Sequence, residues 1–146
     1  MDEPTTGLDV LTQERFLDVI RGLRLQRQSS IVYISHDLGV VRHVSDRVLI
    51  MYLGRVVESG PTEALFAAPN HPYTQALLAE VGKLEPKKRS FVPIRGEIPS
   101  PLTPPSGCHF HPRCPHAMQR CREVAPEFRE IAPRRWSACY LNDETQ

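Results

Sequence analysis

The sequence has no apolar run long enough to cross a membrane. Its uninterrupted apolar stretches are short, such as Val48–Met51, whereas a membrane-spanning helix needs about 20 apolar residues. The N-terminus has no basic segment followed by an apolar core, so we expect no secretory signal. Any association with a membrane is therefore expected to go through a partner protein.

The sequence also lacks an excess of charge of either sign. It contains 18 basic and 17 acidic residues, a formal net charge of +1, so charge alone predicts neither nucleic acid nor an acidic partner. One basic run, Lys87–Arg89, has only Phe91 near it, whereas binding of single-stranded nucleic acid requires a broad basic surface with stacking aromatics. We interpret this run as a solvated connector and predict no nucleic-acid partner.

Cysteine is absent from the first 107 residues, and proline is unevenly placed. All four cysteines lie after position 107, and five of the fourteen prolines lie between Pro93 and Pro105. This stretch should be extended, because proline fixes φ and biases its predecessor away from helix. The composition predicts an apolar, periodic part over residues 1–82, a Pro-rich linker over 83–107 and a Cys-rich extension over 108–146. The extension is too short to build a core alone.

The first part alternates between helical and strand patterns. Phe16, Ile20 and Leu23 recur at helical spacing, and Ile31–Ile34 is a β-branched and aromatic run typical of a strand covered on both faces. Asp37 suits the N-cap of the next helix. The pattern predicts an α/β fold with a parallel sheet flanked by helices. The expected helices cover residues 10–28, 38–44, 60–67 and 73–81, and the expected strands cover 31–34, 47–53 and 56–59, the last two forming a hairpin.

Three polar side chains fall at the carboxyl ends of predicted strands, which is the edge where α/β sheets bind ligands. They are the neighbouring carboxylates Asp2 and Glu3 and the histidine His36. Nucleotide hydrolysis requires Mg²⁺ to neutralise phosphate charge and a base or orienting group for water. Asp2 would suit the metal, since Mg²⁺ prefers one or two carboxylates with waters and phosphate oxygens. Glu3 would suit the role of base or orienting group for the attacking water. An isolated Asp-Glu-Pro would be better explained as a turn or a helix cap, so the interpretation depends on its surroundings.

The four cysteines leave three interpretations open. Five, six and seventeen residues separate Cys108, Cys114, Cys121 and Cys139. Two disulfides are the simplest interpretation, but a reducing compartment, expected for a nucleotide-hydrolysing protein, argues against them. Zinc sites usually contain a Cys-x₂₋₄-Cys pair, which is missing here. An iron–sulfur cluster needs four thiolates, but the spacing matches neither ferredoxin pattern.

The residues around the cysteines add possible ligands and charges. Neighbouring histidines could replace a missing zinc ligand, and neighbouring arginines would lower the pKa of the thiols and offset the charge of a ligated metal. The composition predicts a soft, thiolate-rich metal site of open identity. These neighbours are His109, His111, His116, Arg113, Arg120 and Arg122.

Two motifs resemble those of the ATP-binding subunits of ABC transporters. The first is Asp-Glu-Pro-Thr-Thr-Gly-Leu-Asp at residues 2–9, and the second is the Ser-His-Asp triplet after the next predicted strand. The resemblance implies that Asp2 ends a Walker B strand and helps to hold Mg²⁺, and that Glu3 acts as the general base. It also implies that Asp9 belongs to the D-loop that contacts a partner subunit, and that His36 is the switch histidine that senses the γ-phosphate of ATP.

The second half of the chain resembles one branch of that family. Residues 71–78, His-Pro-Tyr-Thr-Gln-Ala-Leu-Leu, resemble the His-Pro-Tyr motif of oligopeptide and dipeptide transporter ATPases, and residues 96–101 and 104–114 resemble their C-terminal extension. We interpret the His-Pro-Tyr residues as a turn and helix start that packs on the core. Members with these cysteines are associated with a [4Fe–4S] cluster. The resemblance implies this cluster, with zinc as the alternative, at Cys108, Cys114, Cys121 and Cys139.

Two motifs of such an ATPase are missing from the 146 residues. The single Gly-Lys pair, Gly82-Lys83, has Leu77 and Leu84 where a P-loop requires Gly and Ser or Thr. The Ser-Gly-Gly-Gln signature is also absent. Because P-loop amides cradle the phosphates, we expect this chain alone to bind nucleotide weakly and to show no ATPase activity.

The resemblance therefore implies the C-terminal part of an ABC-type P-loop ATPase domain, a parallel sheet with helices, followed by a small irregular Pro/Cys-rich extension. The implied function is to energise peptide import by hydrolysing ATP with Mg²⁺ at the cytoplasmic face of the inner membrane. The implied partners are a second ATP-binding subunit, two membrane permease subunits and an extracytoplasmic peptide-binding protein. The competing hypothesis is a non-enzymatic iron–sulfur or zinc module from a truncated gene.

Overall fold

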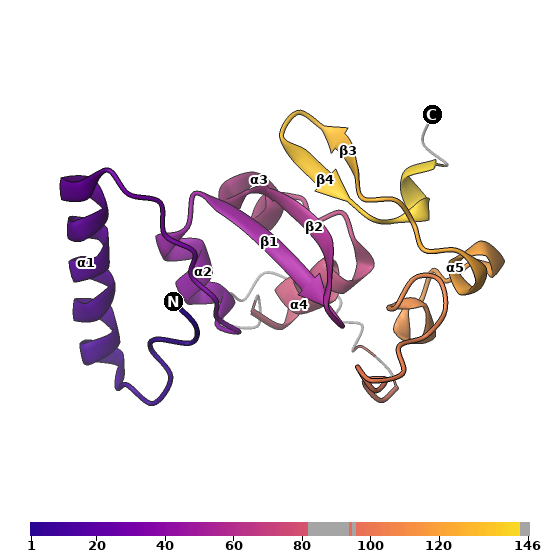
Figure 1. The fold of residues 1–146 in the computed structure, drawn as a ribbon, viewed down its shortest axis with the longest axis horizontal. Helices are drawn as coiled ribbons and strands as arrows, with labels where there is room; N and C mark the ends of the chain where they lie inside the picture. The colour runs from indigo at the N-terminus through magenta and orange to yellow at the C-terminus, as the bar shows by residue number, and fades with distance from the viewer. Residues whose placement is uncertain (82–93, 95, 144–146) are drawn as a thin grey trace. The chain divides into compact units, whose positions relative to one another are not determined.

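The computed structural model describes residues 1–81, 94 and 96–143, which form two compact units, Met1–Asp46 and Arg47–Gln146 (Figure 1). We call them unit 1 and unit 2. The first part of the predicted linker, including its basic run, lies outside the described residues. No helix in the described part of the chain combines the length and apolar composition needed to span a bilayer.

The two helices of unit 1 form where local sequence signals predict them. Helix α1 spans Val10–Arg27, and the side chain of Asp9 caps its N-terminus. Helix α2 spans Leu38–Val44, and the side chain of Asp37 caps it. Such caps satisfy amides that have no partner within the helix. Both predicted helices are therefore confirmed.

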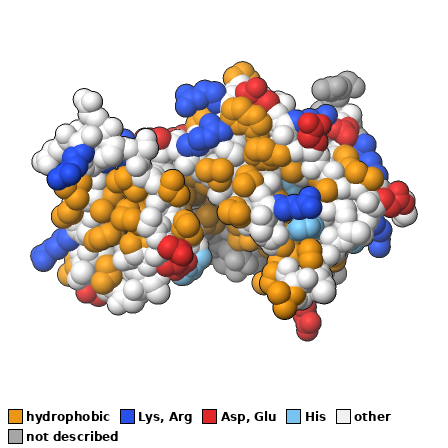
Figure 2. Space-filling view, viewed as in Figure 1, with side chains coloured by type: hydrophobic (Ala, Val, Ile, Leu, Met, Phe, Trp, Pro, Cys, Tyr) orange, Lys and Arg blue, Asp and Glu red, His pale blue; other side chains and the backbone are white. Residues whose placement is uncertain are grey.

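Unit 1 has a small core. Leu17 of α1, Val40 of α2 and Thr5 are buried, and the Thr5 hydroxyl lies 3.1 Å from the hydroxyl of Tyr33. Many other apolar side chains of this unit are exposed, and Figure 2 shows them spread over the face in view.

The parallel sheet that we predicted is not formed by the described residues. Residues 31–34 pair through one parallel bridge, between Asp2 and Ile34, and Val32 is 76% exposed. A parallel strand is stabilised by neighbouring strands and by helices on both faces. Here, within the described part of the chain, residues 1–3 are the only segment that pairs with it. The fold is α/β as predicted, but its sheet is antiparallel and belongs to unit 2.

The sheet of unit 2 has four antiparallel strands in the order β1-β2-β4-β3. Strands β1 (Arg47–Tyr52) and β2 (Arg55–Pro61) form the predicted hairpin. Its two turn residues, Leu53 and Gly54, have φ angles of 43° and 77°. Positive φ at both central residues matches the twist of a tight hairpin.

The Cys-rich extension adds the other two strands. Strands β3 (Arg129–Ala132) and β4 (Arg135–Ser137) form a second hairpin, and β4 pairs with β2 through Ser137–Glu58 and Trp136–Ser59. The extension was predicted to be irregular, but it also contains short helical elements. These are η2 (His111–Arg113), α5 (Gln119–Glu123) and η3 (Tyr140–Asp143).

Two helices complete the described part of unit 2. Helix α3 (Thr62–Ala67) packs against β1 and β2, and helix α4 (Pro72–Val81) follows it (Figure 1). Both were predicted, with starts that differ by one or two residues.

The core of unit 2 joins segments that are distant in sequence. Phe110, from the extension, is 1% exposed. The centroid of its ring lies 5.2 Å from that of Tyr52 in β1 and 5.3 Å from that of Tyr73 in α4. The two tyrosine rings are 4.8 Å apart. Each such aromatic pair contributes about 0.5–1.5 kcal/mol beyond its burial. The extension therefore shares a core with the hairpin and α4, which explains how so short a segment can fold.

Candidate functional site

The predicted nucleotide-site residues lie in unit 1, where two chain segments meet. The amide of Ile34 donates to the carbonyl of Met1, and the amide of Glu3 donates to the carbonyl of Ile34, both at 2.9 Å. These bonds align the two segments in parallel, so Asp2 and Glu3 run beside the residues that lead to His36. The two paired segments thus bring Glu3 close to His36.

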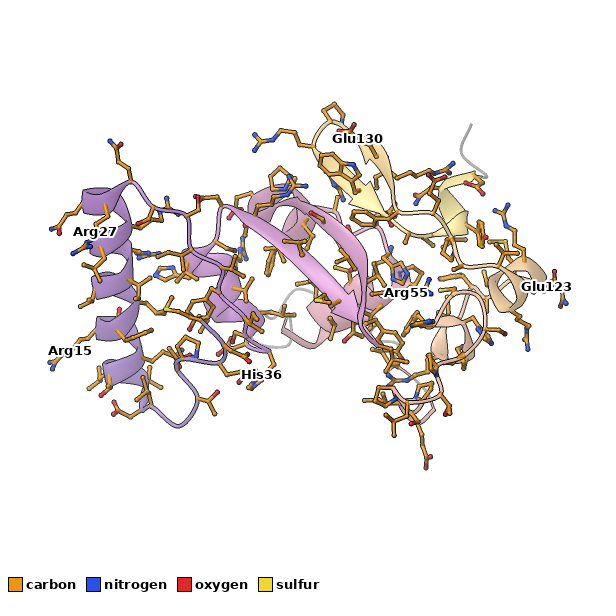
Figure 3. All side chains as sticks on the ribbon, viewed as in Figure 1. Arg15, Arg27, His36, Arg55, Glu123 and Glu130 are labelled. Atoms are coloured by element: carbon orange, nitrogen blue, oxygen red, sulfur yellow. The ribbon has the colours of Figure 1, made fainter. Side chains whose placement is uncertain are left out.

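The structure brings Glu3 and His36 into direct contact. Nδ1 of His36 lies 2.7 Å from Oε1 of Glu3, and it carries a proton because a carboxylate can only accept. Oε2 of Glu3 accepts a 2.6 Å hydrogen bond from the Thr6 hydroxyl. Figure 3 shows His36 on the loop that precedes α2. Both oxygens of the predicted base are therefore held by side chains of unit 1.

This contact shifts both protonation equilibria. The Thr6 hydroxyl and His36 lower the pKa of Glu3, while Glu3 raises the pKa of His36. The side chain of Glu3 is 37% exposed and that of His36 is 80% exposed. Solvent therefore screens the pair, and its contribution to stability is small. Its importance is geometric: it keeps an ionised carboxylate beside a histidine.

The other two predicted residues are arranged differently. Asp9 accepts the Thr12 amide at 3.0 Å and the Thr12 hydroxyl at 2.7 Å, and these bonds lower the pKa of Asp9. Its carboxylate therefore serves as the cap of α1. Asp2 is exposed and pairs through its backbone with Ile34.

The four cysteines of unit 2 line one pocket of about 20 Å³, roughly the space of one water molecule. All four are free thiols, so the disulfide interpretation finds no support. Three histidines and Phe110 also line this pocket, which we call the cysteine pocket. The thiols that line it are Cys108, Cys114, Cys121 and Cys139.

Close backbone contacts bring the cysteines together. The amide of Cys108 donates to the carbonyl of Cys121 at 2.8 Å. Gly107, with a φ of 66°, makes this approach possible, because a Cβ there would lie 2.4 Å from the same carbonyl oxygen. Cys121 is the buried residue of α5, and Cys139 follows β4. The sheet and the α5 turn therefore both position the thiols.

Burial favours the neutral form of Cys108, Cys114 and Cys139. Burial raises the pKa of Cys108 and Cys114, and it raises the pKa of Cys139 to about 11. Backbone amides act in the opposite direction. Those of Phe110, His116 and Leu141, each two residues after a cysteine, lower the pKa of Cys108, Cys114 and Cys139 respectively. Such amides would stabilise thiolates once a metal displaced their protons.

The predicted cationic neighbours differ from those in the structure. The charge that lowers the pKa of Cys108 is Arg55, at the start of β2 (Figure 3). Arg120 instead binds the carbonyl of Tyr140 and pairs with Asp143. The guanidinium of Arg120 is therefore engaged by two oxygen acceptors, a pairing that its closeness in sequence to Cys121 does not reveal.

A single metal ion has no ready-made site among the described residues. No three His, Cys, Asp or Glu side chains there converge closely enough to hold one ion. Tetrahedral zinc needs sulfur ligands about 2.3 Å from a common centre. The zinc alternative, and with it the stand-alone metal module, is therefore not supported.

Sequence reasoning missed three residues that shape the cysteine pocket: Glu58, His71 and Phe110. Glu58 and His71 are each 1% exposed. The carboxylate of Glu58 accepts the amides of Asn70 and His71 at 2.9 and 2.8 Å. A glutamate within an apolar strand pattern was a usable signal of a buried acceptor, but its partners could not be identified without the fold.

Comparisons with known proteins show what the chain resembles. A sequence model of the family described as "Oligopeptide/dipeptide transporter, C-terminal region" matches residues 57–121. The chain is 48% identical over 140 residues to the di/tripeptide transport ATP-binding protein DppF of Pseudomonas aeruginosa, an alignment that covers 95% of this chain and 43% of that protein. It is 46% identical over 143 residues to the oligopeptide transport ATP-binding protein AppF of Bacillus subtilis, covering 96% and 44%. The chain thus spans less than half the length of these curated relatives.

Proposed function

The chain belongs to the family of ATP-binding proteins of oligopeptide and dipeptide ABC transporters, and we propose that it forms the C-terminal part of an ATP-hydrolysing subunit that energises peptide import. The observation that carries the proposal is the 2.7 Å contact between Glu3 and His36. Glu3 directly follows Asp2 in the chain. A base, a histidine and a metal-binding carboxylate at one edge are the groups that phosphoryl transfer to water requires. In this proposal the bridge between Asp2 and Ile34 is part of the parallel sheet of the complete ATPase domain.

Glu3 would act as the general base. It would accept a proton from the attacking water while the water oxygen bonds to the γ-phosphorus and ADP leaves with the electrons of the broken P–O bond. Thr6 and His36 keep Glu3 ionised, the state a base needs before it accepts a proton. If His36 turned to the γ-phosphate, Glu3 would lose an interaction that lowers its pKa and would become more basic.

Asp2 and Asp9 would contribute to the surroundings of the nucleotide. Asp2 would supply one carboxylate to Mg²⁺, which neutralises phosphate charge when bound with ATP. Asp9, at the N-terminus of α1, would face a second ATP-binding subunit.

The proposed assembly lies at the cytoplasmic face of the inner membrane. There the protein would bind peripherally to two permease subunits, and an extracytoplasmic protein would deliver the peptide. Residues 1–82 would form the C-terminal part of the ATPase domain, residues 83–107 a linker and residues 108–146 the Cys-rich extension.

We also propose that the cysteine pocket binds a [4Fe–4S] cluster with a structural or regulatory role. Four thiols, a donor set that suits iron, line one pocket. A cluster is larger than an ion, so its four sulfur ligands need not converge on one point. The thiol side chains would have to rotate to enlarge the present space, and the nearby amides would then stabilise the bound thiolates.

Peptide uptake tests the transport function. The gene that contains this sequence is deleted in its host, and uptake of labelled dipeptides, tripeptides and oligopeptides is measured before and after the gene is restored. We expect deletion to abolish uptake of at least one class, the parent gene and exposed control Glu14→Gln to restore it, and Glu3→Gln to fail. Unchanged uptake after deletion would overturn the transport function, and full restoration by Glu3→Gln would overturn the role of Glu3.

Metal content tests the cluster. The chain is purified without oxygen, and iron, acid-labile sulfide, zinc and visible absorbance are measured. We expect iron and sulfide in equal amounts with a broad absorbance that reduction bleaches. Stoichiometric zinc without iron would overturn the cluster.

A further inference from the structure

His71, the first residue of the His-Pro-Tyr motif, is a buried polar residue that the proposed ATPase chemistry does not use. Its ring lines the cysteine pocket together with all four thiols, and the residue is 1% exposed. His111 and His116 also line the pocket, but His111 is half-buried and His116 is exposed. A fully buried imidazole beside four sulfur atoms calls for an explanation.

The backbone of His71 is held in place by a buried carboxylate. Glu58 in β2 accepts the amides of Asn70 and His71, one with each oxygen. Arg135 in β4 lies 3.5 Å from the same carboxylate and supplies a counter-charge. Charge-assisted hydrogen bonds of this kind are strong, so β2 and β4 fix the position from which the ring extends.

The ring is also held, with one orientation and one tautomer. Its Nδ1 accepts the amide of Tyr73 at 3.1 Å, and Phe110 lies beside it with 5.8 Å between ring centroids. A nitrogen that accepts an N–H cannot itself carry a proton, so the ring proton is on Nε2. Burial lowers the pKa of His71 to about 4, which agrees with a neutral ring at physiological pH.

A donor N–H that lines a pocket favours an acceptor there, because a donor left unpaired on burial costs about 1–3 kcal/mol. The cysteine pocket offers sulfur atoms. Hydrogen bonds to the sulfurs are among the factors that set the reduction potential of an iron–sulfur cluster. A donor stabilises the extra negative charge of the reduced cluster and therefore raises its potential.

We propose that His71 donates its Nε2–H to a sulfur atom of the cluster in the cysteine pocket, so that the His-Pro-Tyr motif tunes the reduction potential of that cluster. The inference rests on the proposed cluster and assigns His71 a positioning role with no part in ATP hydrolysis. It also links β2, β4 and α4 to the pocket, because Glu58, with Arg135 beside it, fixes the backbone of His71 while the amide of Tyr73 orients its ring.

The simpler explanation is that His71 only satisfies the Tyr73 amide at the start of α4. Two substitutions separate the two roles. In His71→Asn, the side-chain oxygen can take the place of Nδ1 as acceptor for Tyr73, but no donor reaches the position of Nε2. In His71→Gln, the longer side chain places an N–H near the position of Nε2, but the acceptor for Tyr73 is lost.

The 146-residue parent chain and both variants are reconstituted anaerobically with ferrous iron and sulfide. Iron content, urea unfolding and the midpoint potential are measured, the last by dithionite titration followed by electron paramagnetic resonance. We expect His71→Asn to unfold like the parent but to have a more negative midpoint. We expect His71→Gln to be less stable but to keep a midpoint near that of the parent.

Equal midpoints in the parent and His71→Asn would overturn the inference while leaving the cluster intact, and so would a His71→Gln midpoint as negative as that of His71→Asn. A parent chain that binds no iron would overturn the cluster and the inference together. A second measurement does not depend on how the variants fold. In the parent chain labelled with ¹⁵N-histidine, the reduced cluster should show magnetic coupling to a histidine nitrogen and to an exchangeable proton, and the absence of both couplings would refute the donor role.

Discussion

Nδ1 of His36 lies 2.7 Å from Oε1 of Glu3, a contact between residues 33 positions apart in the chain. It joins the residue after Asp2 to the second residue after the segment 31–34. The two groups hold each other in charged forms, so the pair has a pH range that experiment can measure.

The Glu3–His36 pair is expected to be intact only within a pH window. The pKa of His36 is raised from 6.5, so the contribution of the pair to stability is complete below that value and is lost as pH rises through the raised pKa. The pKa of Glu3 is lowered from 4.5, so the contribution is present above that value and is lost as pH falls through the lowered pKa. Nuclear magnetic resonance titration of the His36 ring should give a pKa above 6.5 that falls in Glu3→Gln. Asp18→Asn, on α1, should leave it unchanged; identical titrations in all three proteins would contradict the contact.

Removing the Glu58 carboxylate should destabilise unit 2. Glu58→Ala leaves the buried amide of His71 and the part-buried amide of Asn70 unpaired and takes the counter-charge from Arg135, changes that together cost about 3–5 kcal/mol. The urea midpoint of unfolding, followed by circular dichroism, should fall accordingly. Glu127→Gln is the control, because Glu127 is exposed, and its midpoint should match that of the parent. A Glu58→Ala midpoint equal to that of the control would show that the carboxylate does not hold the loop before α4.

A methyl group at Gly107 should open the cysteine pocket. In Gly107→Ala, the new Cβ would meet the carbonyl oxygen of Cys121 at 2.4 Å. The alanine would also have to adopt a φ of 66°, which an L-residue rarely does. We expect a loss of about 2 kcal/mol or more. Gly22→Ala in α1 is the control, since nothing lies within 4 Å of its added Cβ, and it should be neutral or stabilise by up to about 1 kcal/mol. Equal urea midpoints for the two variants would rule out the close approach.

The thiols of the metal-free, reduced chain should react slowly with iodoacetamide. Burial raises the pKa of Cys108 and Cys114 and raises that of Cys139 to about 11, so few thiolates are present at pH 8. The rate of modification at Cys139, measured by peptide mass spectrometry, should rise steadily up to about pH 11. Unfolding in urea should bring it to the rate of a free cysteine. A native rate equal to the unfolded rate would contradict the buried pocket.

Much of the local structure could be predicted from the sequence because its causes are local. The Asp37 cap, the apolar spacing of α1 and the tight turn between β1 and β2 depend on neighbouring residues, and the structure has all three, with the turn at Leu53-Gly54, one residue before the predicted Gly54-Arg55. The motifs around Asp2 and the His-Pro-Tyr triplet identified the family by the same kind of local pattern.

The sheet could not be predicted in this way. Residues 31–34 have the composition of a buried parallel strand, but pairing requires neighbours, and local pattern carries no information about which ones a segment finds. The partner of β2 on its second side is β4, almost 80 residues later in the chain. Only the tertiary structure shows that the extension completes the sheet.

By itself, the sequence determined the helices α1 to α4, the β1–β2 hairpin, the Asp37 cap and to which family the chain belongs, since all of these follow from short-range patterns. Only the tertiary structure decided that Glu3 pairs with His36 and that Glu58 holds the His-Pro-Tyr loop. It also decided that His71 faces four thiols. These contacts join residues far apart in the chain, and no local pattern specifies which distant residues meet or how deeply they are buried.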